Sequence, residues 1–149
     1  MQIRFAMNMI SLLQKPKVKN NLNCAELPLA SHIFPPDQYT REEEHGHSLL
    51  RFKDQTTGKS FFLEIKTCSC DWMHHIQWCT EMQLRKYLSY HKKTPTFLLL
   101  DVQNDNNNSH SYYLLSMTQA CHVNLIDTSI MHCKIDTNAP VLSKQLWSR

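Results

Sequence analysis

Two strand-like runs on either side of a helical pattern constrain the fold of this 149-residue chain more than any other feature. Residues 60–67 read Ser-Phe-Phe-Leu-Glu-Ile-Lys-Thr, and residues 96–102 read Thr-Phe-Leu-Leu-Leu-Asp-Val. A short, continuously apolar run such as the second is typical of a strand that is buried on both faces. A strand, a crossover helix and a second buried strand form a βαβ unit with parallel strands. The sequence therefore predicts an α/β fold.

The crossover helix is predicted to begin after Asp71, which can cap it, and to run to about His91. Thr94-Pro95 then ends it, because proline cannot continue a helix. Side chains at three- and four-residue steps form one stripe of this helix. They are Trp72, Ile76, Cys79, Gln83 and Tyr87.

Each of the two strands is also predicted to pair with an antiparallel neighbour. Residues 48–54 precede 60–66 across a short loop that contains Gly58, which is the pattern of a β-hairpin. Residues 111–116 follow 96–102 across the polar loop 104–108. We therefore expect a mixed central sheet of about four strands, flanked by helices.

Composition suggests one domain preceded by an extension. Residues 14–40 are rich in Pro, Asn and Lys, which favours extended chain and turns. We therefore expect residues 1–38 to be a partly irregular N-terminal extension and residues 39–149 to be a single domain. After Thr118 the periodicity fades, and we expect a short strand or helix packed on the sheet.

Charge, glycine and cysteine content restrict the class of function. A net charge of +3 permits a nucleic-acid partner without requiring one. Only two glycines are present, so a P-loop for nucleotide triphosphates is excluded. Six cysteines without a secretion signal, and no apolar run of membrane-spanning length, suggest reduced thiols in the cytoplasm.

Glu64 and Lys66 are the strongest functional candidates. A buried carboxylate or ammonium costs several kcal/mol unless it is paired or binds a metal, so charges within an apolar strand need a reason. Residues at i and i+2 share one face of a strand, so Glu64 could bind a divalent cation while Lys66 stabilises an anion beside it. This arrangement suits phosphodiester chemistry, although Glu-x-Lys also occurs by chance on half-exposed strands.

The order of elements, with Glu64 and Lys66 on the second hairpin strand, resembles the PD-(D/E)xK restriction-endonuclease-like superfamily over residues 40–117. A bacterial domain-of-unknown-function branch is the most similar. The motifs that carry this resemblance are Gly46-His-Ser48, Gly58-Lys59, Phe61-Phe-Leu-Glu-Ile-Lys66, and Tyr87-Leu88 through Pro95-Thr-Phe-Leu-Leu-Leu-Asp101.

Gln83 and Tyr87 resemble the Gln-x-x-x-Tyr helix motif of RecB-type nucleases, in which both residues face the site. The alternative is an amphipathic helix whose tyrosine packs in the core. The resemblance implies a Mg²⁺-dependent nuclease. In it Lys66 orients or activates the attacking water and stabilises charge on the phosphate, and Gln83 positions substrate or water.

The sequence departs from the superfamily pattern on the first hairpin strand, where Ser48 stands in place of an aspartate. Folding the hairpin between residues 54 and 60 pairs Ser48 with Lys66 and places Asp54 opposite Ser60, roughly 13 Å from Glu64. Asp54 is therefore too far from Glu64 to bind the same ion, and we expect its side chain to stabilise the turn. We expect Glu44 to complete the metal site with Glu64, unless residues 42–44 are only a solvated face.

Directly after the predicted strand at residues 60–67, the sequence contains five side chains that are soft metal ligands: Cys68, Cys70, His74, His75 and Cys79. Cys68, Cys70, His74 and Cys79 could form a closed metal site, although the Cys-x-Cys spacing is tighter than usual for zinc. The alternative is buried thiols beside surface histidines.

Three functions remain open at this stage. The first is a metal-dependent nuclease that binds nucleic acid, with DNA as the expected substrate and with a homodimer or a larger protein partner to hold it. The second is a catalytically inactive interaction module of the same fold, which the serine at position 48 favours. The third is a small Cys/His metal-binding protein.

Overall fold

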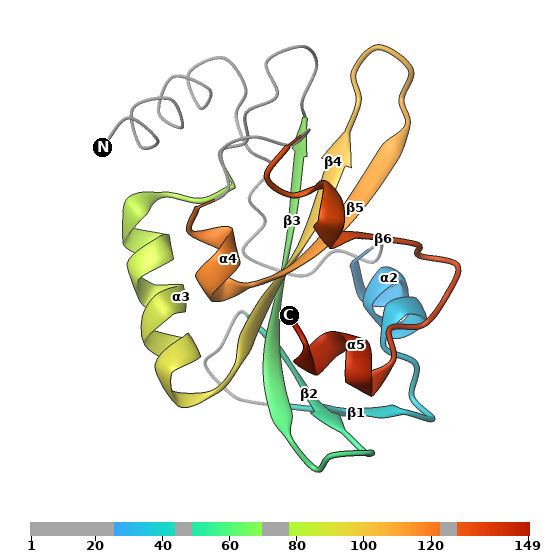
Figure 1. The fold of residues 1–149 in the computed structure, drawn as a ribbon, viewed down its shortest axis with the longest axis vertical. Helices are drawn as coiled ribbons and strands as arrows, with labels where there is room; N and C mark the ends of the chain where they lie inside the picture. The colour runs from blue at the N-terminus through green and yellow to red at the C-terminus, as the bar shows by residue number, and fades with distance from the viewer. Residues whose placement is uncertain (1–25, 44–48, 70–77, 123–127) are drawn as a thin grey trace.

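The computed structural model describes residues 26–43, 49–69, 78–122 and 128–149. Their strands form one sheet in the order β1-β2-β3-β4-β5-β6 (Figure 1). All neighbouring strands are antiparallel except β3 and β4, which are parallel. The strands are β1 Tyr39–Glu42, β2 Leu50–Asp54, β3 Ser60–Ser69, β4 Thr96–Gln103, β5 His110–Ser116 and β6 Lys134–Ile135.

The predicted α/β class and mixed sheet are confirmed, but the described sheet has six strands rather than about four. The two additional strands lie at its edges. β1 has four residues and β6 has two, so neither is long enough to show the apolar alternation from which strands are predicted.

Helix α3, Glu81–Lys93, connects the parallel strands β3 and β4. It begins later than predicted, because the Thr80 hydroxyl caps it by accepting a hydrogen bond from the Gln83 N–H. The expected cap, Asp71, lies outside the described residues. The predicted end is confirmed, since the helix stops at Thr94, one residue before Pro95.

Helices cover both faces of the sheet (Figure 1). One buried cluster joins the sheet to Tyr87 of α3 and Met117 of α4, which spans Met117–Ala120. The other joins the opposite face to Ile33 of α2, Glu26–Ile33, and to Leu146 of α5, Ser143–Trp147. Side chains along β3 alternate between the two clusters, so the domain has a helix, sheet, helix layering.

Helix α2 lies within the segment for which extended chain and turns were predicted. It has only eight residues and contains Pro28 in its first turn, so its sequence shows no helical periodicity. Phe34, directly after it, is fully buried and its ring lies 5.1 Å from that of Tyr39 and 5.2 Å from that of Phe61. Residues before Tyr39 therefore contribute to the same core as the sheet.

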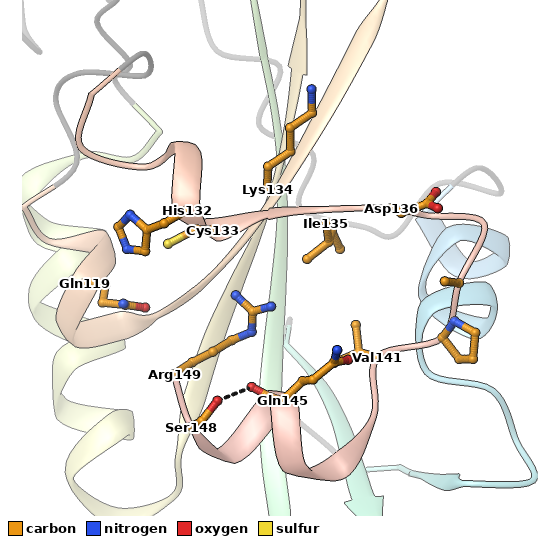
Figure 2. A pocket seen from close by; sticks show the side chains of 12 residues that line it. Gln119, His132, Cys133, Lys134, Ile135, Asp136, Val141, Gln145, Ser148 and Arg149 are labelled. Carbon is orange, nitrogen blue, oxygen red and sulfur yellow. Dashed lines mark hydrogen bonds between the residues drawn. The ribbon is translucent and has the colours of Figure 1, made fainter.

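The segment after β5 is assembled from short elements, as expected from its faded periodicity. Met131–Cys133 form a 3-10 helix, η1, which leads into β6. Together with α4 and α5, these elements line a pocket at the β5 edge of the sheet (Figure 2). Among the described residues, no helix has the length and hydropathy that a membrane span requires.

The loops of the two β-hairpins have the same construction. The side chains of Asp54 and Asn104 each accept a hydrogen bond of 2.9 Å from the backbone N–H two residues further on. Gly58 and Asn108, each four residues further along, have φ of 71° and 55°. Asparagine is one of the few residues besides glycine that adopts this left-handed region readily, so Asn108 replaces glycine in the second loop.

Substitutions at Gly58 can test whether the two hairpin loops share this backbone geometry. No heavy atom lies within 4 Å of the Cβ that a substitution would add, so the cost of a side chain there is backbone strain. We expect Gly58→Ala to lower the free energy of unfolding by about 1–2 kcal/mol and Gly58→Asn to lower it by less. Urea unfolding of both variants measures the difference, and equal losses would contradict the shared loop geometry.

Asp54 links the first hairpin to the C-terminal helix. Its carboxylate is only 1% exposed and accepts hydrogen bonds from Ser143 Oγ and Trp147 Nε1 of α5 as well as from the turn. Burial by itself would raise the pKa of Asp54, but these hydrogen bonds outweigh burial and hold the pKa below its ordinary value. The predicted turn role is confirmed, and a tertiary role is added to it.

Asp54→Asn should destabilise the fold in a pH-dependent manner. Because the folded-state pKa is lowered, the carboxylate stabilises the fold fully above its unfolded-state pKa of about 3.9, and this contribution is lost as pH falls through the folded-state pKa. We expect a loss of about 2–3 kcal/mol at pH 7 that shrinks toward pH 2. Urea unfolding across this range tests it, with the exposed loop substitution Asp105→Asn as control.

Candidate functional site

Glu64 and Lys66 lie on the face of β3 that α3 covers. Their neighbours on that face, Phe62 and Cys68, belong to the buried cluster shared with α3. Glu64 is half-buried, and Lys66 is only 5% exposed. The two charges therefore share one face of a central strand, as the spacing predicted.

Tyr87 of α3 holds the carboxylate of Glu64. Its hydroxyl donates a 2.7 Å hydrogen bond to Oε2, and the backbone N–H of Ile65 donates a 3.1 Å bond to Oε1. Burial, followed by the charge of Glu64 and the hydrogen bond to it, raises the pKa of Tyr87. The phenol therefore stays protonated and acts as a permanent donor to Glu64.

Cys79 lies close enough to both charges to respond to them. Burial raises the pKa of its thiol to about 12, with the positive charge of Lys66 opposing and the negative charge of Glu64 adding to the shift. The thiol is therefore protonated at neutral pH. A nucleophile needs the thiolate, so the protonated Cys79 is suited to packing within this cluster.

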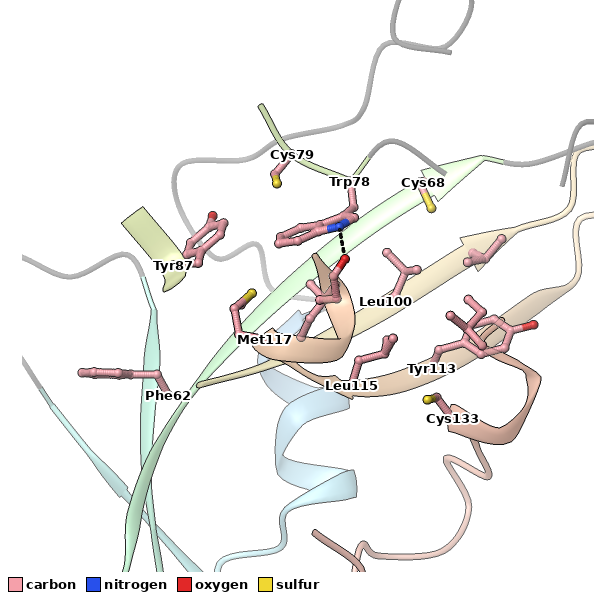
Figure 3. Packing of buried hydrophobic residues seen from close by; sticks show 14 of the residues in the cluster. Phe62, Cys68, Trp78, Cys79, Tyr87, Leu100, Tyr113, Leu115, Met117 and Cys133 are labelled. Atoms are coloured by element: carbon pink, nitrogen blue, oxygen red, sulfur yellow. Dashed lines mark hydrogen bonds between the residues drawn. The ribbon is translucent and has the colours of Figure 1, made fainter. Parts of the chain in front are cut away.

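The ring of Tyr87 also packs in the core, beside a tryptophan that the sequence did not single out (Figure 3). Tyr87 stacks on Trp78 with a centroid distance of 5.7 Å and an interplanar angle of 20°. Trp78 Nε1 donates a 3.1 Å hydrogen bond to the carbonyl of Ala120 in α4. This contact fixes the start of α3 against α4, and thereby fixes the position of Tyr87 over Glu64. A lone tryptophan within an amphipathic stretch has no pattern that reveals such a role.

Gln83 serves the start of α3. Its Oε1 accepts a 3.1 Å hydrogen bond from the backbone N–H of Thr80, which completes a capping box. Of the Gln-x-x-x-Tyr pair, it is therefore Tyr87 that contacts Glu64, while the carbonyl oxygen of Gln83 is used by the helix cap.

The hairpin register differs by one residue from the expectation. Lys53, rather than Asp54, pairs with Ser60, because the backbone N–H of Asp54 closes the loop on the carbonyl of Lys59. Extending this register brings Leu49 alongside Glu64, and Leu49 is buried in the same cluster as Phe62. Asp54 lies on the opposite face with α5, so it does not share a site with Glu64.

Only some of the residues expected at a metal site lie among those that the structure describes. Ser48 and Glu44 lie outside the described residues, as do Cys70, His74 and His75. In the parts of the chain that the structure describes, no group of three or more His, Cys, Asp or Glu side chains could hold a metal ion. Cys68 and Cys79 are buried in the cluster beneath α3. Of the two expected magnesium ligands, Glu64 and Glu44, only Glu64 therefore has a described position.

The cluster combines a carboxylate with fixed orientation and a buried ammonium on one strand face. Comparison of the chain with protein-family models, curated proteins and solved structures finds no match. Function is therefore inferred from the chemistry of these side chains. A carboxylate of this kind can bind a cation or accept a proton, and a nearby ammonium can stabilise a developing negative charge.

Tyr87→Phe isolates the hydrogen bond to Glu64. The variant keeps the ring that stacks on Trp78 but leaves the carboxylate without its phenolic donor, so we expect a loss of about 1.5–3 kcal/mol in the free energy of unfolding. Urea unfolding measures it, and Tyr112→Phe on β5 is the control for removal of a half-buried hydroxyl. Unchanged stability in Tyr87→Phe would mean that the hydrogen bond does not hold Glu64 in place.

Proposed function

We propose that this chain is a restriction-endonuclease-like domain that hydrolyses phosphodiester bonds in nucleic acid. The observation that carries the proposal is the placement of Glu64 and Lys66 on one face of β3, beneath the crossover helix. Lys66 is only 5% exposed, and placing a lysine within an apolar cluster carries a desolvation cost. A role in stabilising a phosphate explains why the charge is there.

Magnesium is the proposed cofactor, with Glu64 and Glu44 as its protein ligands. Mg²⁺ is usually bound by one or two carboxylates together with waters and substrate phosphates, so Glu64 fits as one ligand. The hydrogen bonds from Tyr87 and Ile65 use one acceptor position on each oxygen of Glu64 and fix the orientation of the carboxylate. When bound, the ion would polarise a phosphoryl oxygen.

The protein side chains have separate roles in this proposal. Lys66 stabilises the negative charge that develops on the phosphate and orients the attacking water. Tyr87 is a positioning residue that fixes Glu64. Gln83 contributes through its amide nitrogen, because its oxygen caps α3.

DNA is the proposed substrate, and the cytoplasm is the proposed compartment. The modest net charge of +3 makes a second copy or a larger protein partner useful for holding a polyanion. Cys121 and Cys133, in the described part of the chain, are free thiols, which suits a reducing compartment.

An inactive interaction module of the same architecture is the second candidate. It is favoured by Leu49, a buried apolar residue at the position that the extended register places opposite Glu64, where a second carboxylate would help to bind a metal. In that case Glu64 and Tyr87 form a structural hydrogen bond, and the surface of the domain binds a partner.

A cleavage assay separates the two candidates. Purified protein is incubated with linear, circular and single-stranded DNA and with RNA, in Mg²⁺, Mn²⁺ or EDTA. We expect metal-dependent cleavage that falls at least about 100-fold in Lys66→Met, because that variant keeps the packing and removes the charge. Its free energy of unfolding should be unchanged or higher, since a buried charge is removed.

Lys53→Met is the matched control, because Lys53 is an exposed lysine on β2. Cleavage should persist in this variant. Folded wild-type protein that cleaves none of these substrates in either metal would contradict the nuclease and leave the interaction module. Equal cleavage by wild type and Lys66→Met would show that the reaction occurs elsewhere.

A further inference from the structure

A second polar site lies at the other end of the sheet from the β1 edge, where η1, β6 and α5 meet. The pocket there (Figure 2) has a volume of about 450 Å³, and strands β5 and β4 lie between the edge strand β6 and strand β3. Two further hollows, of about 430 and 240 Å³, share Gln119 with it. Its polar lining residues include Gln119, His132, Lys134, Gln145, Ser148 and Arg149.

Arg149 is the central cation of this pocket. Its guanidinium projects from the end of α5, with Gln119 and His132 drawn on one side and Gln145 on the other (Figure 2). One N–H group donates a 2.9 Å hydrogen bond to the carbonyl of Leu114 on β5. The Nε atom is buried and has no hydrogen-bond partner among the described residues.

The charge of Arg149 lacks a counter-charge in the described structure. No described carboxylate side chain forms an ion pair with it. Asp136 lines the same pocket, but its carboxylate points away from the guanidinium in Figure 2. Burial lowers the pKa of Arg149, with only a small opposing effect from Cys133, which means that the surroundings disfavour the charged form. A guanidinium nevertheless stays protonated in proteins, so an anion would offset this cost.

The two glutamines add donors rather than acceptors to the pocket. Gln119 Oε1 accepts a 3.0 Å hydrogen bond from the N–H of Ser116, and Gln145 Oε1 accepts a 3.2 Å bond from the N–H of Leu142. Both amide oxygens are thereby used in helix caps, whereas both amide NH₂ groups remain as donors. A pocket lined by amide donors and an arginine is complementary to an oxyanion.

We infer that this pocket binds a small organic anion through its carboxylate or phosphate group, with Arg149 as the anchoring cation. A guanidinium matches the geometry of both groups with paired hydrogen bonds. The volume falls within the range of about 300–1,000 Å³ that is usual for small-molecule sites. Val141 and Ile135 provide apolar walls for the body of the ligand. The site is independent of the proposed nuclease cluster.

Nuclear magnetic resonance of the arginine Nε–H groups reads this site directly. Inorganic phosphate and malonate are titrated separately into the full chain at constant ionic strength. We expect a saturable shift of the Arg149 Nε–H signal, identified by its absence from Arg149→Gln, and little shift at Arg85, which is exposed and pairs with Glu81. Saturation by phosphate or by malonate supports the site and shows which oxyanion it prefers. The absence of a saturable shift with both would overturn it.

Gln145→Glu provides a second test that does not depend on Arg149→Gln folding. The glutamate keeps the oxygen that caps α5 and adds a carboxylate to the pocket, so it should supply the missing counter-charge. We expect the affinity for the preferred anion to fall at least about tenfold and the Tm to rise. Gln103→Glu makes the same change at the end of β4, outside the pocket, and should bind as wild type does. Wild-type binding by Gln145→Glu would contradict the site.

Discussion

The parallel pairing of β3 with β4 is the constraint on which the rest of this structure depends. Eight consecutive residue pairs join the two strands, from Phe62 with Thr96 to Ser69 with Gln103. Parallel strands need a long crossover, so α3 must lie over one face of the sheet, and the opposite face must be covered as well because β4 is apolar on both sides. Helices α2 and α5 provide that cover. The chain therefore has to recruit its N-terminal and C-terminal segments to complete one core.

The same pairing of β3 with β4 determines the surroundings of the charged residues on β3. Because α3 crosses the face that carries Glu64 and Lys66, any side chain there must either be apolar or be satisfied from the helix. Tyr87 satisfies Glu64, and its position depends on the capping box at Thr80 and on Trp78, which is bonded to α4. The orientation of one carboxylate thus depends on a helix cap and on an indole N–H that lie far from it in sequence.

The elements that the sequence predicted well are those whose signal is local. Both hairpins, the βαβ unit and the shared face of Glu64 and Lys66 follow from apolar runs, turn residues and the two-residue period of a strand. Helix α2 and the edge strand β1 were not predicted, and β6 was expected only as a short strand or helix without a position, because the stability of these elements comes from tertiary burial and not from a pattern of their own. The one-residue error in register has the same origin, since it was the closure of the loop at Asp54 and Lys59 that set it. The four-residue spacing of Gln83 and Tyr87 was noticed in the sequence. The structure shows that Tyr87 contacts Glu64, whereas Gln83 caps α3.

Lys66 and Arg149 present the same physical problem at two places in the fold. Lys66 is only 5% exposed, and burial lowers the pKa of Arg149, so in each case an uncharged side chain would avoid the cost of desolvating a charge. Asp54 shows how this chain stabilises a buried charge when only structure is required, with hydrogen bonds from α5 and the turn that satisfy the carboxylate internally. Arg149 has one hydrogen bond to a carbonyl and a buried Nε without a partner in the described structure. Asp54 is a structural charge because groups within the protein satisfy its carboxylate. For Arg149 we propose instead that the counter-charge comes from a bound anion, and for Lys66 that it comes from the phosphate of a substrate.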